Sequence, residues 1–192
     1  MRLTTVLTAI SAAASLAVAP AAFAHNTTVG DAYGNAATNV CLFMVDCTYV
    51  NFTQGKPANV VKHNGTVVSW QALQCGALQL RVLRPASHGR LKFVRSSKIE
   101  SAAQPGLNTF TAHIPVRAGD VLALRDAGSS SQSSCLMFAQ AGPTHSVRYY
   151  RPSPLDGVTA APNASTATDQ NSGQGDVGIP NLLVLFSATV QG

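Results

Sequence analysis

The stretch that decides the fold is Gly65–Leu73, whose residues read GTVVSWQAL. It is rich in β-branched side chains, which favour a strand because they pack well on a pleated surface. The dipeptide Asn64-Gly65, where it opens, is a typical turn signal. A lone indole within an apolar strand usually packs inward, so we expect Trp70 in the core, with a sugar-stacking platform as the alternative.

The next segment, Ala77–Leu83 (ALQLRVL), alternates apolar and polar residues and is predicted as a second strand. Pro85 ends this strand, a turn follows at residues 87–89, and residues 91–94 form the returning strand. Residues 77–97 are therefore predicted as an antiparallel hairpin. The alternation predicts which side chains are buried and which point outward: Leu78, Leu80 and Val82 inward, Gln79 and Arg81 outward.

Short strand patterns separated by turn residues continue along the chain. Further strands are predicted where Phe110, Ala112 and Ile114 alternate, at residues 121–124, which we expect to be central, and at residues 135–140, 146–150 and 182–190. Residues 152–180 lose this periodicity and are rich in Pro, Gly, Ser and Thr, which predicts a long surface loop. Around ten strands without helices predict an all-β, two-sheet antiparallel β-sandwich of jelly-roll type.

The first 24 residues have the composition of a secretory signal peptide. Arg2 supplies a positive start, residues 3–18 form an apolar run without a charge, and Ala22–Ala24 (AFA) is a small-x-small cleavage site. We therefore expect a mature protein that begins at His25, is secreted to the extracellular space or cell surface, and forms a single domain over residues 25–192. An uncleaved N-terminal anchor is the alternative.

Charged residues make up 11% of the chain, against roughly 25% in globular proteins generally. The 13 basic and 8 acidic residues give a net charge of +5, and removal of Arg2 with the signal peptide leaves 12 against 8, or +4. This modest charge permits attraction to anionic polymers without requiring one. We expect a cell-envelope glycan or polyanion as partner, no nucleic acid, no cofactor and no transmembrane segment in the mature chain.

All four cysteines follow the signal peptide: Cys41, Cys47, Cys75 and Cys135. An oxidising compartment favours two disulfides, for which three connectivities are possible. We favour Cys41 with Cys47, because five intervening residues let the chain fold back locally, and Cys75 with Cys135 across a long loop. A zinc site is the competing use of four cysteines, but the spacing lacks the close pairs of a metal knuckle.

Five segments carry strand and turn signals: Gly65–Trp70, Leu80–Pro85, Leu107–Phe110, Ile114–Asp120 and the final strand. On these segments the chain resembles uncharacterised secreted actinobacterial β-sandwich modules, some of which precede thrombospondin type 3 calcium repeats. The resemblance covers roughly residues 40–190. It implies an extracellular β-sandwich and no particular reaction. The sequence departs from that pattern in having no acidic calcium repeats, which puts a repeat-mediated adhesive role in doubt.

Motifs of catalysis are not found in the sequence. It has no G-x-S-x-G and no H-E-x-x-H, and its five histidines are scattered. Glycoside hydrolysis needs two carboxylates at one bond, whereas Glu100 is the single glutamate and the aspartates mostly occupy turns. Residues 169–176 loosely resemble a calcium loop but lack its glycine at position six and its glutamate at position twelve. We therefore expect no catalytic residue and no metal site.

The strongest electrostatic feature runs from Arg81 to Lys98, with six basic residues and no acidic one. If the hairpin forms, part of this run can bind teichoic acid, anionic glycans or phospholipid headgroups. The alternative is that these side chains only keep an exposed hairpin soluble and block edge pairing. The candidate ligand-binding residues are Arg84, Arg90, Lys92 and Arg95.

Taken together, these features predict a secreted, disulfide-linked β-sandwich that acts as a non-catalytic binding or surface-structural module for anionic or carbohydrate envelope polymers. A small secreted hydrolase or lyase acting on glycans, with its site under residues 152–180, is the alternative. An inert structural or coat protein is a third reading. A concave pocket with two carboxylates would favour the hydrolase, and a polar surface without a groove would favour the coat protein.

Overall fold

The computed structural model describes residues 25–32, 37–38, 46–128, 135–136, 138–160 and 179–192. These residues form β-strands and one short 3-10 turn without any α-helix, which confirms the all-β prediction. Among them, no helix is long and apolar enough to cross a membrane. The elements are β1 (Asn26–Asp31), β2 (Ala37–Thr38), β3 (Cys47–Thr53), β4 (Lys56–Pro57), β5 (Gly65–Pro85), η1 (Ser87–Gly89), β6 (Leu91–Ser96), β7 (Glu100–Val116), β8 (Val121–Asp126), β9 (Cys135–Leu136), β10 (Phe138–Gln140), β11 (His145–Tyr150), β12 (Thr159–Ala160), β13 (Ile179–Pro180), β14 (Leu182–Val184) and β15 (Phe186–Gln191).

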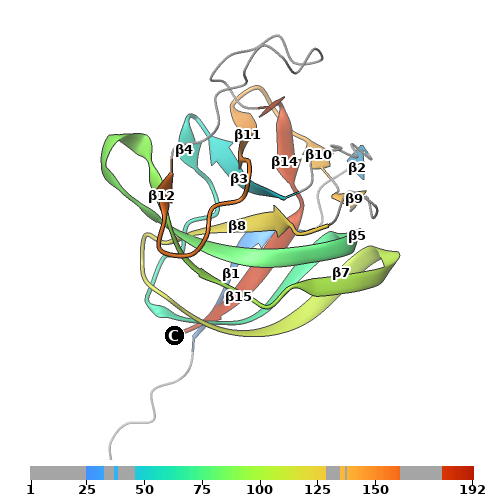
Figure 1. The fold of residues 1–192 in the computed structure, drawn as a ribbon, viewed down its shortest axis with the longest axis horizontal. Helices are drawn as coiled ribbons and strands as arrows, with labels where there is room; N and C mark the ends of the chain where they lie inside the picture. The colour runs from blue at the N-terminus through green and yellow to red at the C-terminus, as the bar shows by residue number, and fades with distance from the viewer. Residues whose placement is uncertain (1–24, 33–36, 39–45, 129–134, 137, 161–178) are drawn as a thin grey trace, which may run out of the picture.

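The strands form two antiparallel sheets of unequal size. The larger has twelve strands in the order β1-β15-β5-β8-β3-β11-β13, with β4, β6, β7, β9 and β12 attached beside this path. The smaller has the order β14-β10-β2. Figure 1 shows the larger sheet curled into a half-barrel, with β5 and β7 running along its lower side. The prediction of antiparallel sheets is thus confirmed.

Strand β5 is the longest strand of the larger sheet and pairs with β6, β7, β8, β9 and β15. The sequence indicates two strands, Gly65–Leu73 and Ala77–Leu83, but the structure joins them into one strand of 21 residues. The pairing of β5 with β7 is irregular between Gln74 and Gly76, and Gly76 has a φ of +91°. Glycine adopts this conformation without strain, so the strand kinks there and continues.

The two edges of β5 are each shared by successive strands. β15, β9 and β8 follow one another along one edge, and β7 and β6 occupy the other. Leu78, for example, pairs with Asp126 of β8 on one side and with Glu100 of β7 on the other. Because β6 and β7 extend each other along the same edge, β5, β6 and β7 form one long, curled hairpin whose turn is η1.

The predicted hairpin over residues 77–97 is therefore confirmed, but the outward orientation predicted for Arg81 is wrong. The side chain of Arg81 is only 3% exposed. Its guanidinium carbon lies 5.2 Å from the centre of the Phe93 ring, and Nη2 lies 3.4 Å from a carboxylate oxygen of Asp156. Alternation fails here because the segment after β11 lies against this face of β5, where the Pro154 carbonyl oxygen accepts a hydrogen bond from Arg81.

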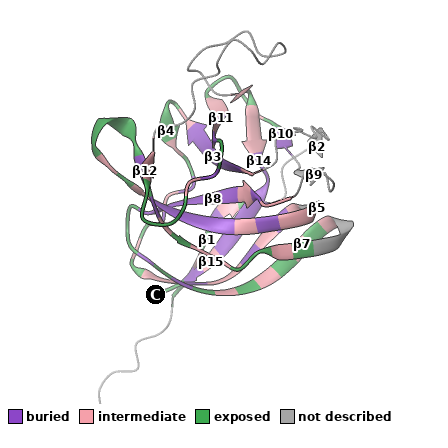
Figure 2. Cartoon of the chain, viewed as in Figure 1, coloured by how far each residue is buried: buried purple, intermediate pink, exposed green. Residues whose placement is uncertain are grey.

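Two hydrophobic clusters lie on opposite faces of the larger sheet. The first surrounds Trp70, which is fully buried with its ring 4.5 Å from that of Phe110, so Trp70 is a core residue rather than a sugar platform. The second contains Phe93 and Tyr150, whose rings meet edge to face at 5.1 Å. Alternate residues of β8 contribute to the two clusters, which confirms the predicted central strand at residues 121–124. Figure 2 shows β8 and the middle of β5 largely buried, and the β5–β6 turn exposed.

The predicted disulfides are not seen among the described side chains. Cys47 is a buried thiol within the first cluster, and Cys41 lies outside the described residues. Cys75 of β5 stands directly opposite Cys135 of β9. Opposed residues of antiparallel strands have Cα atoms about 4.5–5.5 Å apart, within the range of about 4.4–6.8 Å that disulfides span. The Cys75–Cys135 bridge therefore stays a prediction with a compatible backbone register.

Part of the predicted loop at residues 152–180 packs against the larger sheet. The Phe93 N–H donates to the carbonyl oxygen of Val158 over 2.8 Å, and Thr159 of β12 pairs with Lys92 of β6. Figure 1 shows β12 beside the β5–β6 hairpin. This segment thereby covers the second cluster. Residues 161–178, which include the calcium-like stretch 169–176, lie outside the described residues.

Candidate anion-binding groove

Two hollows follow one another between β6 and the second half of β7, and together we call them the β6–β7 groove. The first has a volume of about 370 Å³ and is lined by residues 96–98 and 111–114. The second has a volume of about 340 Å³ and is lined by residues 94–95 and 115–117, with Asn64, Gly65 and Arg84. Because β5 is curled, residues near its two ends, Gly65 and Arg84, meet at the second hollow.

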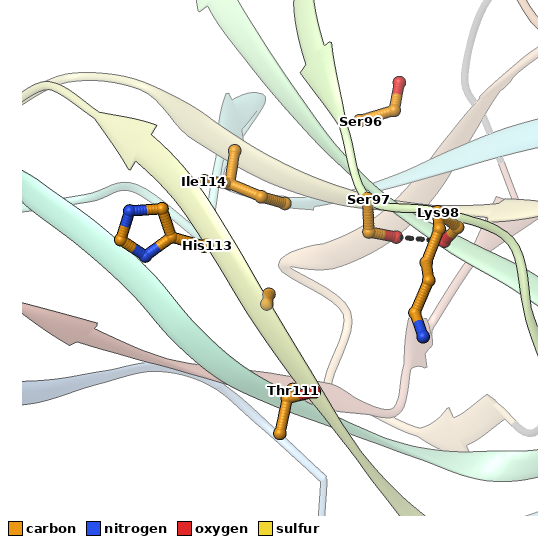
Figure 3. Close-up of a pocket in the computed structure, with 7 residues that line it drawn as sticks. Ser96, Ser97, Lys98, Thr111, His113 and Ile114 are labelled. Atoms are coloured by element: carbon orange, nitrogen blue, oxygen red, sulfur yellow. Dashed lines mark hydrogen bonds between the residues drawn. The ribbon is translucent and has the colours of Figure 1, made fainter.

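The first hollow is walled by polar side chains over an apolar floor. In Figure 3, Ile114 and His113 lie on opposite sides of the β7 ribbon, and Ile114 is directed toward Ser97. Ile114 is 5% exposed, whereas His113 is exposed. The Ser97 hydroxyl donates to the carbonyl oxygen of Lys98 over 2.6 Å, which fixes the bend that joins β6 to β7. The hydroxyls and the Lys98 ammonium give this hollow a polar, cationic rim.

Arg84 lines the second hollow, and its guanidinium group is bound to a carboxylate. Its Nε and Nη2 atoms donate to the two oxygens of Asp120 over 2.7 and 2.9 Å. Asp120 is 1% exposed and also accepts the backbone N–H of Arg117 over 2.9 Å. The hydrogen bonds to Asp120 raise the pKa of the Arg84 guanidinium. Arg84 is therefore mainly a structural residue, because its charge compensates a buried carboxylate.

Two other arginines at the second hollow have guanidinium groups that a ligand can contact. Arg95 on β6 and Arg117 directly after β7 are both exposed. Neither forms an ion pair with a carboxylate in the part of the chain that the structure describes. Lys98, at the other end of the groove, lies 3.3 Å from Glu100, but with 76% of its side chain exposed this pair is weak.

The structure brings together only part of the predicted ligand-binding set. Arg84 and Arg95 line the groove, whereas Arg90 and Lys92 do not line either hollow. Arg90 donates instead to the carbonyl oxygen of Thr159 over 2.8 Å, and Lys92 is exposed opposite Arg84 in the ladder. Arg117 is not apparent as a site residue from the sequence, because it lies outside the basic run and the curl of the hairpin places it at the same hollow as Arg95.

A second, larger cavity lies away from the groove, among β1, β3, β10 and β14. Its volume is about 510 Å³, and its polar lining includes Asn51, Asn59 and Asp31. The Asn51 amide is bound on both sides by the backbone of Val184, over 2.9 and 2.8 Å. Asn59 is 7% exposed, and its Nδ2 atom has no hydrogen-bond partner among the described residues. The cavity is therefore lined by a residue whose buried amide nitrogen lacks a partner among the described residues, which is uncommon for a buried polar group.

Neither the two hollows of the groove nor the larger cavity is lined by a pair of carboxylates in the described part of the chain. The described residues also gather no group of three His, Cys, Asp or Glu side chains that could hold a metal. The chemistry that this geometry offers is electrostatic and hydrogen-bonding contact with an anion. No family model, curated protein or solved structure matches the chain.

Proposed function

We propose that the protein is a secreted, non-catalytic binding module whose β6–β7 groove holds an anionic envelope polymer or glycan. The observation that carries this proposal is the placement of Arg95 and Arg117 at one hollow, both exposed and both without a carboxylate partner among the described residues. Guanidinium groups bind carboxylate, sulfate and phosphate oxygens through paired hydrogen bonds. The open groove predicts weak binding that falls steeply with salt, because exposed charges are screened.

Retention on a matrix of sulfated polysaccharide tests this proposal. We expect residues 25–192 to be retained and the double variant Arg95→Gln, Arg117→Gln to elute at clearly lower salt. The matched control replaces Lys56 and Arg151, two exposed cations that do not line the groove. Lys56→Gln, Arg151→Gln lowers the net charge by the same amount and should elute close to the unmodified protein. Equal elution of the two double variants would leave only a general charge effect and would refute the groove as the site.

The two-sheet jelly-roll architecture is also part of this proposal. The presence of two sheets and of ladder neighbours distant in sequence, such as β15 beside β5, supports it. Secretion is supported by the signal-peptide pattern in the sequence of residues 1–24, and N-terminal sequencing of the exported protein tests it. An experimental structure of the full mature chain would test the jelly-roll connections.

A neutral carbohydrate in the larger cavity is a second candidate, favoured by the buried Asn59 amide. A volume of about 510 Å³ is within the range of about 300–1,000 Å³ that small-ligand sites occupy. Screening of mono- and disaccharides by heat-induced unfolding would detect such binding as a rise in Tm. Asn59→Leu should abolish that rise while leaving polyanion retention unchanged. If no sugar raises the Tm, water fills the cavity and this second candidate fails.

A further inference from the structure

Two histidines far apart in sequence lie side by side where the larger sheet begins and ends. His25 directly precedes β1, and His63 lies shortly before β5. Their ring centres are 6.0 Å apart, with the ring planes inclined by 57°. The sheet produces this contact, because β15 pairs with β1 on one side and with the start of β5 on the other. Neither ring belongs to the groove or to the larger cavity.

Both histidines are held in place by neighbouring groups. The backbone N–H of His25 donates to the carbonyl oxygen of Gly192 over 3.1 Å, and the Gly192 N–H donates back over 3.1 Å. The Nε2 atom of His63 lies 2.7 Å from the hydroxyl of Thr27. Its Nδ1 atom lies 3.2 Å from the carbonyl oxygen of Asn64 in an exposed contact. The Nε2 atom of His63 is thus positioned by Thr27. The Nδ1 atom has a long, exposed contact that a bound metal ion can replace.

The predicted cleavage after Ala24 changes the chemistry of His25. It converts the backbone nitrogen of His25 into a primary amine, which carries a lone pair once deprotonated. The amine and the imidazole of one residue can then chelate a single ion, while the amine keeps a proton for Gly192. The His63 imidazole, whose ring centre lies 6.0 Å from that of His25, supplies a third nitrogen donor.

We propose that cleavage after Ala24 creates a copper(II) site formed by the amine and imidazole of His25 and the imidazole of His63. Imidazole and amine nitrogens suit copper, nickel and zinc, and Cu²⁺ has the highest affinity for such a donor set among the divalent first-row ions. The Thr27 hydroxyl acts as the outer partner that orients the His63 ring. This proposal rests on the predicted cleavage and does not depend on polyanion binding at the groove.

The competing explanation is a contact between two rings that only helps to pack β1 beside the start of β5. Copper titration of protein that begins at His25, prepared by cleaving a fusion directly before that residue, separates the two explanations. Affinity is measured against a competing chelator, and electron paramagnetic resonance reports the number of coordinating nitrogens. We expect one Cu²⁺ per chain, bound by three nitrogens.

Two variants each remove part of the proposed site. His63→Gln should lose one nitrogen from the spectrum and lower the affinity at least tenfold, since even loss of an outer partner costs about 10–100-fold. A long flexible Gly/Ser extension before His25, which keeps the new terminal amine far from the imidazole, removes the amine from the site and should lower the affinity similarly. His88→Asn, which removes an exposed histidine of η1 that lines neither the groove nor the larger cavity, is the matched control and should bind like the unmodified protein.

Equal affinity of the unmodified, His63→Gln and extended proteins would overturn the site. A spectrum unchanged by His63→Gln would also overturn it, because the ion would then be held by His25 alone. N-terminal sequencing of the exported protein tests the cleavage separately, and a mature chain that starts elsewhere than His25 would overturn the proposal for the protein in its own compartment. Retention on the polysaccharide matrix is a separate measurement, so failure of the groove and failure of the copper site are distinguishable.

Discussion

The two halves of β5 lie in different surroundings although they belong to one strand. In the first half, Gly65–Leu73, the buried side chains such as Trp70 face the first cluster, and the other side chains are partly exposed. In the second half, from Leu78 to Pro85, the four consecutive residues 80–83 are all buried, Arg81 included. The difference arises because the second cluster and the segment after β11 pack against the second half, where Leu83 joins Phe93 and Tyr150 and where Arg81 contacts Pro154 and Asp156.

Because the two halves differ in burial, some arginines of the basic run stabilise the fold and others remain exposed for a ligand. A buried polar group costs free energy unless it finds hydrogen-bond partners within the protein. Arg81 accordingly donates to Gln79 and to the carbonyl oxygen of Pro154, and burial lowers the pKa of its guanidinium. Arg84 compensates the buried Asp120. Arg95, which lies on β6 outside this covered part, lines the groove and has no carboxylate partner among the described residues.

The largest expected effect lies at the kink between the two halves, where Cys75 stands opposite Cys135. We expect these residues to form a disulfide, which closes a loop of about 60 residues and contributes roughly 4 kcal/mol in the chain-entropy model. Cys75→Ser should lower the free energy of unfolding, measured in urea, by about that amount. Thiol titration of the denatured, unreduced protein checks the bond itself, and four reactive thiols would contradict it.

Alkaline pH should weaken the core beneath the second half of β5. Cys47 of β3 pairs with Asp126, which in turn pairs with Leu78, and burial raises the pKa of the Cys47 thiol from 9.0 to about 11. Between these values the unfolded chain loses its proton and the folded chain keeps it, so stability is full below pH 9 and falls as the pH rises toward 11. The loss approaches about 3 kcal/mol for a shift of about two units.

Urea unfolding at a series of pH values between 8 and 11 measures this loss. Cys47→Ala is the control, because it removes the titrating thiol while leaving the buried Tyr49 beside it. Burial also raises the pKa of Tyr49, which adds a further loss at higher pH in both proteins. Identical pH profiles for the unmodified protein and Cys47→Ala would show that the thiol does not contribute.

Breaking the Arg84–Asp120 ion pair in the second half should cost more stability than replacing Arg95, which has no carboxylate partner among the described residues. Arg84→Gln leaves the Asp120 carboxylate buried without its counter-charge, and we expect a loss of roughly 2–3 kcal/mol. This is below the value of about 3–5 kcal/mol for a fully buried pair because Arg84 is partly exposed. Arg95→Gln should change stability by less than about 0.5 kcal/mol. Chemical unfolding of both variants decides, and equal losses would contradict the division of the basic run.

Two glutamines, one in each half, give the smallest expected contrast. Gln79 accepts from Arg81 over 3.2 Å and from Arg125 over 3.0 Å, and it donates to the Ser97 carbonyl over 2.7 Å. Gln71 makes one exposed hydrogen bond, to Thr109 over 3.1 Å. Gln79→Ala should cost about 1–2 kcal/mol, because two of its partners are charged. Gln71→Ala should cost at most about 0.5 kcal/mol, and similar costs would mean that the second half is no better covered than the first.

The sequence predicted local structure well where one face of a strand is buried. Alternation placed Leu78, Leu80 and Val82 inside, and the turn residues placed the end of the hairpin. The same reasoning failed at Arg81, because alternation carries no information about a second layer supplied by residues 151–160. The sequence pattern also predicted two strands in place of β5. A glycine at a kink within one strand, such as Gly76, gives the same local signal as a glycine at a turn between two strands.

The candidate sites differ in how much the sequence reveals. The basic run that contains Arg84 and Arg95 is visible in the sequence, and so is a cleavage site that would leave His25 first. Their partners are not, because Arg117 reaches Arg95 only through the curl of the hairpin and His63 reaches His25 only through β15. Local composition thus determined the all-β class, the hairpin and the sign of the charge. Long-range strand pairing decided which charges are neutralised and which histidines meet, because those contacts depend on register between strands distant in sequence.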